Sequence, residues 1–345
     1  MLINSSNIQK ENLNIKSSTE LLNDRYIILE KIGDGLTSKV FRVLDTFSNE
    51  IKVAKIFDDN LFPIFAKEEK LLKIINNYNI KSIIRLYDSG IGPLSKDGNS
   101  EEKMFFILEF AAHGTLLDQI LKTRNGFSEI VCKYILYEII KIISSLHKKG
   151  ICHRDIKLEN ILLVGDDYHL KLCDFGFSTK FLDKYNNKKS LNRKVGTKYY
   201  CAPEILENKI YDGEKVDIFS IGALLFILMT KRLAFEEAKS FTYIETESQK
   251  LYNLIKINLI DKYWKKIEKI YKITKLSPEF KKLFIKMVSY NPSERPCCDE
   301  IIDSEWMKEI KNADEDYMQE IRNKMINEMN IEKVCIFYFL FLYIL

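Results

Sequence analysis

Apolar residues come in short runs over the first third of the chain and in long stripes after it. Five short runs, rich in Ile, Val, Tyr and Phe, predict strands at 26–29, 40–44, 51–57, 83–87 and 104–108. Between the third and fourth runs, apolar residues recur every three or four positions over 62–75, which predicts a helix. This part of the chain is therefore expected to form a small sheet with one helix.

From residue 113 onward the pattern is helical. A long apolar stripe over 129–149 ends at Gly150, a natural helix stop, and 218–229 is so uniformly apolar that it should be a buried helix. Further helices are expected at 249–260, 278–288 and 299–306. Strands first and helices later predict an α+β fold, with a small β-rich lobe and a larger helical lobe.

Composition narrows the class of protein. The chain has 345 residues, 46% hydrophobic and 30% charged, which is typical of a globular protein, and its net charge of +4 gives no reason to expect nucleic acid or an anionic membrane as partner. Seven cysteines without a CxxC pair indicate reduced thiols, so we expect a cytoplasmic protein, with the nucleus as the alternative. Residues 1–25 are rich in Asn, Ser and Lys, which predicts a disordered leader without a signal peptide.

The end of the chain is unusual. Residues 334–345 are all apolar, but this run is shorter than the roughly 20 residues of a membrane-spanning helix. A tail packed on the fold, or an incorrect gene boundary, is favoured over a membrane or partner contact. The charged residues 311–333 are helix-prone, and a solvated capping helix is favoured over an autoinhibitory or partner helix.

The chemistry lies in His153-Arg154-Asp155-Ile156-Lys157-Leu158-Glu159-Asn160, followed by Asp174-Phe175-Gly176 after a strand-like run at 169–173. These segments resemble the catalytic and metal-binding segments of eukaryotic protein kinases. The resemblance implies that Asp155 is the base, that Lys157 steadies the γ-phosphate of ATP, and that Asn160 and Asp174 bind Mg²⁺. A lysine two residues after Asp155 resembles the Ser/Thr kinases.

A second segment, Gly33-Asp34-Gly35-Leu36-Thr37-Ser38, lies between two predicted strands. Glycines let backbone N–H groups approach phosphates, although hairpin turns with two glycines are common. The segment resembles the kinase glycine-rich loop with Ser38 as its third member, and Lys55 resembles the lysine that holds the α- and β-phosphates. The ATP contacts implied by the resemblance are Ile32, Gly33, Gly35, Ser38, Val40, Val53, Lys55, Glu109 and Ala111, with Asn160 and Asp174.

The resemblance also implies a helix glutamate that pairs with Lys55. Glu68 is preferred over the adjacent Glu69, because the helix phase places Leu72, one turn after Glu68, toward the core. The 13-residue gap between Lys55 and Glu68 is shorter than is usual in the family.

Residues 174–204 resemble an activation segment. By the family pattern, Thr197 contacts Asp155 and Lys157, Glu204 pairs with Arg295, and Asp217 braces the catalytic loop. Arg154 would receive a phosphate on this segment, yet the usual acceptor position is Arg193. The protein is therefore expected to act without that phosphate, or to use Ser190 instead.

The resemblance covers about 26–306 and implies a kinase domain at 26–310, with an N-lobe at 26–109, a C-lobe at 112–310 and ATP between them, followed by a helical extension with an apolar tail at 311–345. It is closest to the calcium/calmodulin-dependent group, although Thr115 and Ile227 replace acidic residues of basophilic members. We expect a monomeric protein Ser/Thr kinase that uses ATP and Mg²⁺ and acts on protein substrates. A pseudokinase scaffold and a small-metabolite kinase are the alternatives.

Overall fold

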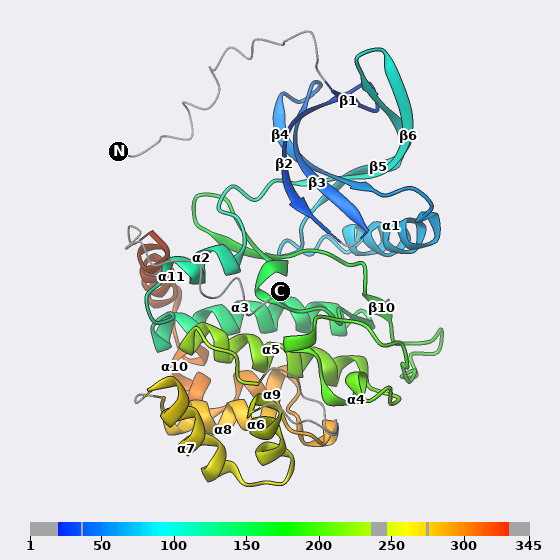
Figure 1. Ribbon diagram of the computed structural model, residues 1–345. Helices are drawn as coiled ribbons and strands as arrows, with labels where there is room; N and C mark the ends of the chain where they lie inside the picture. The colour runs from blue at the N-terminus through cyan, green and yellow to red at the C-terminus, as the bar shows by residue number, and fades with distance from the viewer. Residues whose placement is uncertain (1–19, 36, 236–246, 274–275, 331–345) are drawn as a thin grey trace. The chain divides into compact units, whose positions relative to one another are not determined.

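The computed structural model describes residues 20–35, 37–235, 247–273 and 276–330, which fall into two compact units (Figure 1). The first unit holds the described residues up to Lys73 together with Arg85–Phe110, and the second holds Ile74–Ile84 and the described residues from Ala111 onward. Most of the expected leader and the whole apolar run 334–345 lie outside the described residues, so the expectations for them stay predictions.

The first unit contains a closed antiparallel barrel with the strand order β1-β2-β3-β4-β6-β5, in which β5 pairs back with β1 (Figure 1). A cluster of buried apolar side chains forms its core: Leu22, Tyr26, Val43, Ala54, Ile56, Phe105 and Ile107. The unit's elements are β1 (Leu21–Leu22), β2 (Tyr26–Asp34), β3 (Ser38–Asp45), β4 (Glu50–Phe57), β5 (Leu86–Lys96) and β6 (Asn99–Glu109), with most of α1 (Phe62–Asn77).

The prediction that residues up to 25 form a disordered leader is wrong at β1. Leu21 and Leu22 pair with both β2 and β5, and Leu22 is fully buried in the barrel core. Two residues are too few to show the alternation that marks a strand in a sequence. The barrel closes only through this short strand.

The predicted strand at 83–87 is misplaced. Ile83 makes only an isolated bridge to Leu172, whereas β5 begins at Leu86 and continues to Lys96. The residues between the predicted strands at 83–87 and 104–108 form most of a β5–β6 hairpin that turns at Asp97-Gly98, whose φ values of 48° and 82° are those of a type I′ turn. Polar residues fill the outer half of this hairpin, so hydrophobicity did not mark it.

The second unit is mainly helical, as predicted. The predicted buried helix is α5 (Gly213–Thr230), in which every residue from Val216 to Leu228 is buried. The helix predicted at 129–149 is α3 (Glu129–His147), and the helix predicted at 299–306 divides into α9 (Cys298–Ile302) and a short 3₁₀ turn. The other long helices of the described residues are α2 (Leu116–Lys122), α6 (Glu247–Lys256), α7 (Ile260–Tyr271), α8 (Pro278–Met287) and α11 (Glu315–Asn330), and the shorter ones are α4 (Pro203–Leu206) and α10 (Lys308–Lys311).

Four short strands of the second unit position the residues of interest. They form two antiparallel pairs, β7 (Ile151–Cys152) with β10 (Thr179–Lys180), and β8 (Ile161–Val164) with β9 (His169–Leu172). Among the described helices, none combines the length and the apolar character that crossing a membrane requires.

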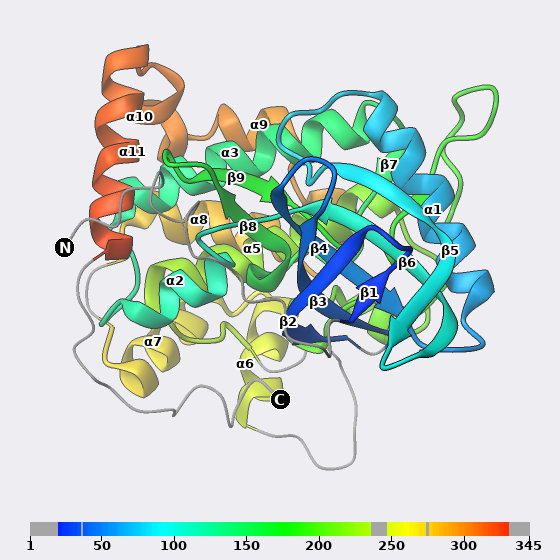
Figure 2. The ribbon, with the colours of Figure 1, turned by 90° about the horizontal axis from the view of Figure 1, so that it is seen from above.

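Helix α11 packs on α3 and α2 rather than standing in solvent (Figure 2). Its inner face buries Ile321, Met325 and Met329. Glu328 accepts a hydrogen bond from the backbone N–H of Ser128, the residue that precedes α3, at 2.9 Å. An acceptor at this position satisfies a donor that a helix N-terminus otherwise leaves unpaired.

Candidate active site

Backbone pairing brings two predicted metal ligands to the same end of the β8–β9 hairpin. Asn160 directly precedes β8, and Cys173 directly follows β9. The N–H of Cys173 donates a hydrogen bond to the carbonyl of Asn160 at 3.0 Å, and Asp174 is the residue that follows Cys173. The hairpin register, Ile161 opposite Leu172, therefore holds Asn160 and Asp174 near each other although they are far apart in sequence.

Asp155 is the centre of a cluster of polar side chains and is itself buried. The hydroxyl of Thr197 donates to one carboxylate oxygen at 2.7 Å, and the ammonium of Lys157 lies 3.0 Å from the other. Lys157 also donates to the Thr197 hydroxyl at 3.0 Å. The structure thus brings together the three residues that the sequence places in one catalytic role.

The amide of Asn160 completes the cluster. Its Nδ2 donates to the backbone carbonyl of Asp155 at 2.8 Å and to the carboxylate at 3.2 Å. With the amino group committed to Asp155, the side-chain carbonyl of Asn160 is the atom available as an oxygen ligand.

The oxygen donors fit Mg²⁺ better than a metal that prefers nitrogen or sulfur. In the part of the chain that the structure describes, no three His, Cys, Asp or Glu side chains form a metal cage. Mg²⁺ is normally held by one or two protein oxygens together with water and substrate phosphates, so Asn160 and Asp174 suffice for it.

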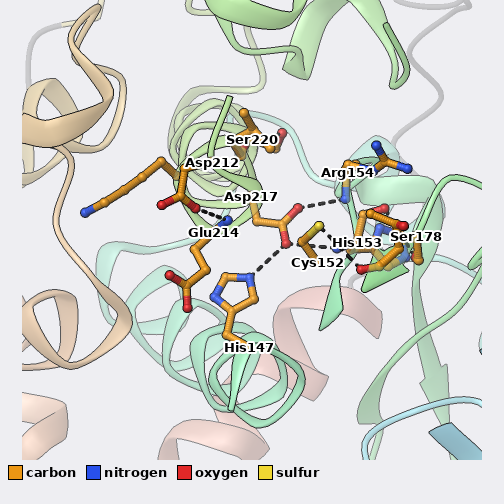
Figure 3. Close-up of polar contacts among 12 residues, drawn as sticks. His147, Cys152, His153, Arg154, Ser178, Asp212, Glu214, Asp217 and Ser220 are labelled. Carbon is orange, nitrogen blue, oxygen red and sulfur yellow. Dashed lines mark hydrogen bonds and ion pairs between the residues drawn. The ribbon is translucent and has the colours of Figure 1, made fainter. Parts of the chain in front are cut away.

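The backbone around the catalytic loop is held in an unusual conformation. Arg154 has φ of 67° and Asp174 has φ of 60°, a left-handed region that non-glycine residues rarely adopt. Asp217 of α5 stabilises the first of these, because its carboxylate accepts the backbone N–H groups of His153 at 2.9 Å and Arg154 at 2.7 Å (Figure 3). The predicted bracing contact of Asp217 is therefore present.

Histidine side chains extend this brace. His147, on α3, places Nε2 2.9 Å from the Asp217 carboxylate (Figure 3), and His153 places Nε2 3.0 Å from the carbonyl of Cys173. Both partners can only accept, so each Nε2 must carry a proton. His147 was not predicted, because nothing in the sequence links it to a residue 70 positions later.

Arg154 is buried, and among the described residues its guanidinium donates to uncharged groups. It donates to the carbonyl of Phe177 and, at 2.8 Å, to the hydroxyl of Tyr211. Tyr211 in turn donates to the carbonyl of Arg193 at 2.7 Å. Tyr211 therefore links the catalytic loop to the segment that precedes Thr197, and sequence reasoning missed it.

Gly196 lies where this segment passes the catalytic loop. Its φ of 103° favours glycine, and a Cβ there would lie 2.8 Å from the carbonyl oxygen of Arg154. A larger residue would push Thr197 away from Asp155.

Electrostatics favour a charged Lys157 beside Asp155. Burial alone would lower the pKa of Lys157, but the charge of Asp155 and its hydrogen bond outweigh burial and raise that pKa. Burial raises the pKa of the neighbouring Glu159, whose Oε2 has no hydrogen-bond partner among the described residues. Lys157 therefore stays an ammonium at neutral pH.

In the first unit, Lys55 pairs with Glu68. The Nζ of Lys55, on β4, lies 2.7 Å from the Oε1 of Glu68. Glu68 lies on α1 and is only 3% exposed. The rival Glu69 instead accepts from Lys73 at 2.8 Å and from Ser89 at 2.9 Å. The structure thus brings Lys55 to the glutamate that the helix phase favoured, in spite of the short spacing.

The predicted glycine-rich loop is the β2–β3 turn. Gly33 pairs with Val40, and the N–H of Gly35 donates to the carbonyl of Ser38 at 2.8 Å, which closes the turn. The Ser38 side chain is buried, so it stiffens the turn where a third glycine would loosen it. Ile32, on β2, is 48% exposed.

The remaining predicted nucleotide contacts lie at strand and loop positions. Val53 pairs with Leu108 across β4 and β6, and Glu109 ends β6. The N–H of Glu109 donates to the carbonyl of Arg85 at 3.0 Å, so a hydrogen bond from adenine would have to reach its carbonyl. Ala111 begins the second unit, where its carbonyl accepts from Gly114 at 3.2 Å.

Glu204 and Arg295 form a buried, two-pronged ion pair. The guanidinium donates to both carboxylate oxygens, at 2.6 Å and 2.8 Å, and Arg295 is 1% exposed. Such a fork fixes the end of the segment that carries Thr197, and truncating one partner would leave a buried charge unpaired.

Comparison with known proteins shows the family of the chain. The family model of the protein kinase domain matches residues 26–307, so the chain belongs to the protein kinase family and the predicted fold class is confirmed.

Relatives at about 30% identity are named as protein kinases, among them a calcium-dependent and a serine/threonine kinase. CBL-interacting protein kinase 26 of Oryza sativa subsp. japonica is 30% identical over 300 residues, which cover 85% of this chain and 54% of that protein. Calcium-dependent protein kinase 5 of Plasmodium berghei (strain Anka) is 31% identical over 305 residues, 88% of this chain and 48% of the relative. CBL-interacting serine/threonine-protein kinase 14 of Arabidopsis thaliana is 28% identical over 289 residues, which cover 83% of this chain and 58% of that protein. The chain thus spans about half the length of these curated relatives, and the predicted likeness to the calcium/calmodulin-dependent group is confirmed.

Proposed function

We propose that the chain is a protein serine/threonine kinase, which transfers the γ-phosphoryl group of ATP to Ser or Thr hydroxyls of proteins. The observation that carries this proposal is the cluster in which Asp155 contacts Thr197, Lys157 and Asn160 within 3.2 Å. Phosphoryl transfer needs positioned oxygen ligands, a cation and a carboxylate near the acceptor, and the cluster supplies each of these.

In this proposal Asp155 accepts the proton of the acceptor hydroxyl. Thr197 and Asn160 orient its carboxylate, and Lys157 contributes a positive charge toward the transferred phosphoryl group. Asn160 and Asp174 hold Mg²⁺, which when bound neutralises charge on the phosphates. Thr197 also limits the space beside Asp155, which favours the short side chains of Ser and Thr as acceptors over the longer side chain of Tyr.

Most of the proposed nucleotide contacts lie in the first unit. Lys55 binds the α- and β-phosphates, and Glu68 keeps its ammonium directed through the 2.7 Å ion pair. The turn with Gly33, Gly35 and Ser38 offers backbone N–H groups to phosphate, and Ile32, Val40 and Val53 offer apolar surface to adenine. Backbone groups of Glu109 and Ala111 hydrogen-bond the adenine edge.

Two other classes of function remain to be tested against this one. A scaffold with the same fold would bind partners without transfer, but it has no chemical need for Lys55, Asp155, Asn160 and Asp174 together. A kinase of small metabolites would leave protein substrates untouched. A monomeric state and a cytoplasmic location stay predictions.

The experiment is transfer of labelled phosphate from ATP to a generic protein substrate by the full chain. Asp155→Asn and Asp174→Ala should each lower kcat by roughly 10²-fold or more, the scale of a lost general base or metal ligand. The control is Asp166→Asn, which makes the same Asp-to-Asn change at an exposed position of the β8–β9 turn. It should transfer phosphate at the rate of the wild type. Transfer that survives Asp155→Asn would contradict the assigned role, and nucleotide binding without any transfer by the wild type would favour the scaffold.

A further inference from the structure

Basic residues concentrate in one stretch of the second unit, from Lys180 to Lys198. This stretch carries seven Lys and Arg and a single acidic residue, Asp183, a formal charge of +6. The whole chain carries +4, so the rest of the protein has a net charge of −2. The net positive charge of the protein therefore arises from this stretch. In Figure 1 the stretch begins at the end of β10 and is drawn in green.

The charged groups of this basic segment face solvent. Lys184, Lys189, Arg193, Lys194 and Lys198 are all exposed. The carboxylate of Asp183 is hydrogen-bonded within its own loop. It accepts hydrogen bonds from the backbone N–H groups of Tyr185 at 2.7 Å and Asn187 at 2.9 Å. Lys188 contacts the carboxylates of Asp212 and Glu214 at the start of α5.

Arg193 and Lys194 have no ion-pair partner among the described residues, yet their backbone is fixed. Leu191 exchanges backbone hydrogen bonds with Tyr211 at 3.0 Å and 2.8 Å, and the Tyr211 hydroxyl donates to the carbonyl of Arg193. Two adjacent cations repel each other, and no ion pair with a described residue offsets this repulsion. An anion from outside the described chain would relieve this repulsion.

The basic segment runs directly beside the acceptor position. The acceptor hydroxyl must reach Asp155, and Asp155 is bonded to Thr197, which Lys198 follows and Arg193 and Lys194 precede. An extended peptide advances about 3.5 Å per residue, so side chains within a few residues of the acceptor come within reach of these cations.

Building on the proposed function, we propose that this basic segment selects protein substrates that carry Asp or Glu beside the acceptor Ser or Thr. Carboxylates on the substrate would pair with Arg193 and Lys194 while the acceptor hydroxyl contacts Asp155. The interaction is between opposite charges at the surface, so it lowers KM and speeds encounter more than it changes the chemical step.

One carboxylate argues for the opposite selection. Glu159 lies near Asp155, and its Oε2 has no hydrogen-bond partner among the described residues, so it could accept an arginine of the substrate. The charge of Lys157 already acts on Glu159, whereas Arg193 and Lys194 form no ion pair with any residue that the structure describes. We therefore favour selection of acidic peptides, and a preference for basic ones would overturn the proposal.

The test compares peptides that share one acceptor serine and differ only in flanks of Asp/Glu, Asn/Gln or Lys/Arg. For the full wild-type chain, kcat/KM should be about tenfold higher with acidic than with neutral flanks, the sum of a few exposed charge pairs. The advantage should lie in KM and should shrink as salt rises. The double variant Arg193→Glu/Lys194→Glu should lose the acidic preference and keep its rate on the neutral peptide.

The matched control is Lys262→Glu/Lys265→Glu, the same change of charge at exposed positions of α7. It should keep the preference for acidic flanks. Equal rates on all three peptides would overturn this inference alone, whereas no transfer to any peptide would count against the proposed kinase activity. If Arg193→Glu/Lys194→Glu instead weakened binding to phosphatidylserine vesicles and left peptide kinetics unchanged, the segment would serve a membrane and the proposal would be wrong.

Discussion

The hydroxyl of Tyr211 lies 2.8 Å from Nη1 of Arg154 and joins that buried guanidinium to the carbonyl of Arg193. Arg154 is the residue that the sequence marks as a receiver of phosphate, and here its guanidinium donates to the hydroxyl of Tyr211 and to the carbonyl of Phe177. Position 193 cannot be phosphorylated because it is an arginine. The Tyr211 hydroxyl thus links the Arg154 guanidinium to this segment without a phosphate.

From this relationship we predict that the kinase works without phosphate on the segment. Ser190→Ala should keep kcat within about twofold of the wild type, because Ser190 is exposed. Tyr211→Phe should lower kcat about 5- to 100-fold with little change in KM for ATP, since an unsatisfied buried donor costs roughly 1–3 kcal/mol. Steady-state kinetics on phosphatase-treated protein measure both effects.

Tyr185→Phe is the matched control, because Tyr185 is 71% exposed on the same segment. It should behave like the wild type. If Ser190→Ala abolished transfer and only phosphate-bearing protein were active, the phosphate-dependent alternative would be correct instead.

The candidate site could be predicted largely because its residues are held in short, spaced motifs. Asp155, Lys157 and Asn160 lie within six positions, and the β8–β9 hairpin brings Asp174 to them. Tyr211 and His147 could not be predicted, because their contacts depend on how α3 and α5 pack. Nothing in the spacing of either residue identifies its partner.

The fold was predictable where hydrophobic patterns were long. The buried helix α5 was clear because nearly every position is apolar, whereas β1 has only two residues and the outer halves of β5 and β6 are polar. The start of β5 was misplaced because Ile83 and Ile84 look like strand residues. They pack in the second unit instead, where Ile84 donates its N–H to Leu172.

The two adjacent glutamates of α1 should respond differently to loss of charge. Glu68→Gln removes the buried partner of Lys55 and should lower kcat/KM for ATP about 10- to 100-fold, since hydrogen bonds to charged groups contribute roughly 1.5–3 kcal/mol. Glu69→Gln changes a side chain that bonds Lys73 and Ser89, and it should stay within about twofold. Kinetics at varied ATP would decide, and a larger loss in Glu69→Gln would reverse the assignment.

The barrel should show a specific dependence on acid. The hydrogen bond from Arg25, at 2.8 Å, holds the pKa of the buried Asp45 far below its ordinary value. A depressed native pKa gives stability that is complete above the unfolded value, about 3.9, and is lost as pH falls below it. Asp45→Asn should therefore be less stable than the wild type at pH 7, by about 1–3 kcal/mol, and the difference should narrow near pH 3.

Thermal midpoints of wild type and Asp45→Asn at both pH values measure this difference. Asp97→Asn, at the exposed β5–β6 turn, makes the same change without an ion pair and should show no gap at either pH. A gap of equal size at pH 7 and pH 3 would mean that Asp45 acts through packing rather than charge.

Helix α11 should be an integral part of the second unit. Met325 is 1% exposed and lies on the buried face with Ile321 and Met329, while Arg322 donates to the hydroxyl of Tyr134 on α3 at 2.7 Å. Met325→Ala removes buried apolar volume and should lower stability by about 2–5 kcal/mol. Asn327→Ala, on the exposed face of the same helix, should change stability by less than about 0.5 kcal/mol. Chemical unfolding followed by fluorescence would measure both, and equal midpoints for the two variants would show that α11 contributes little to the fold.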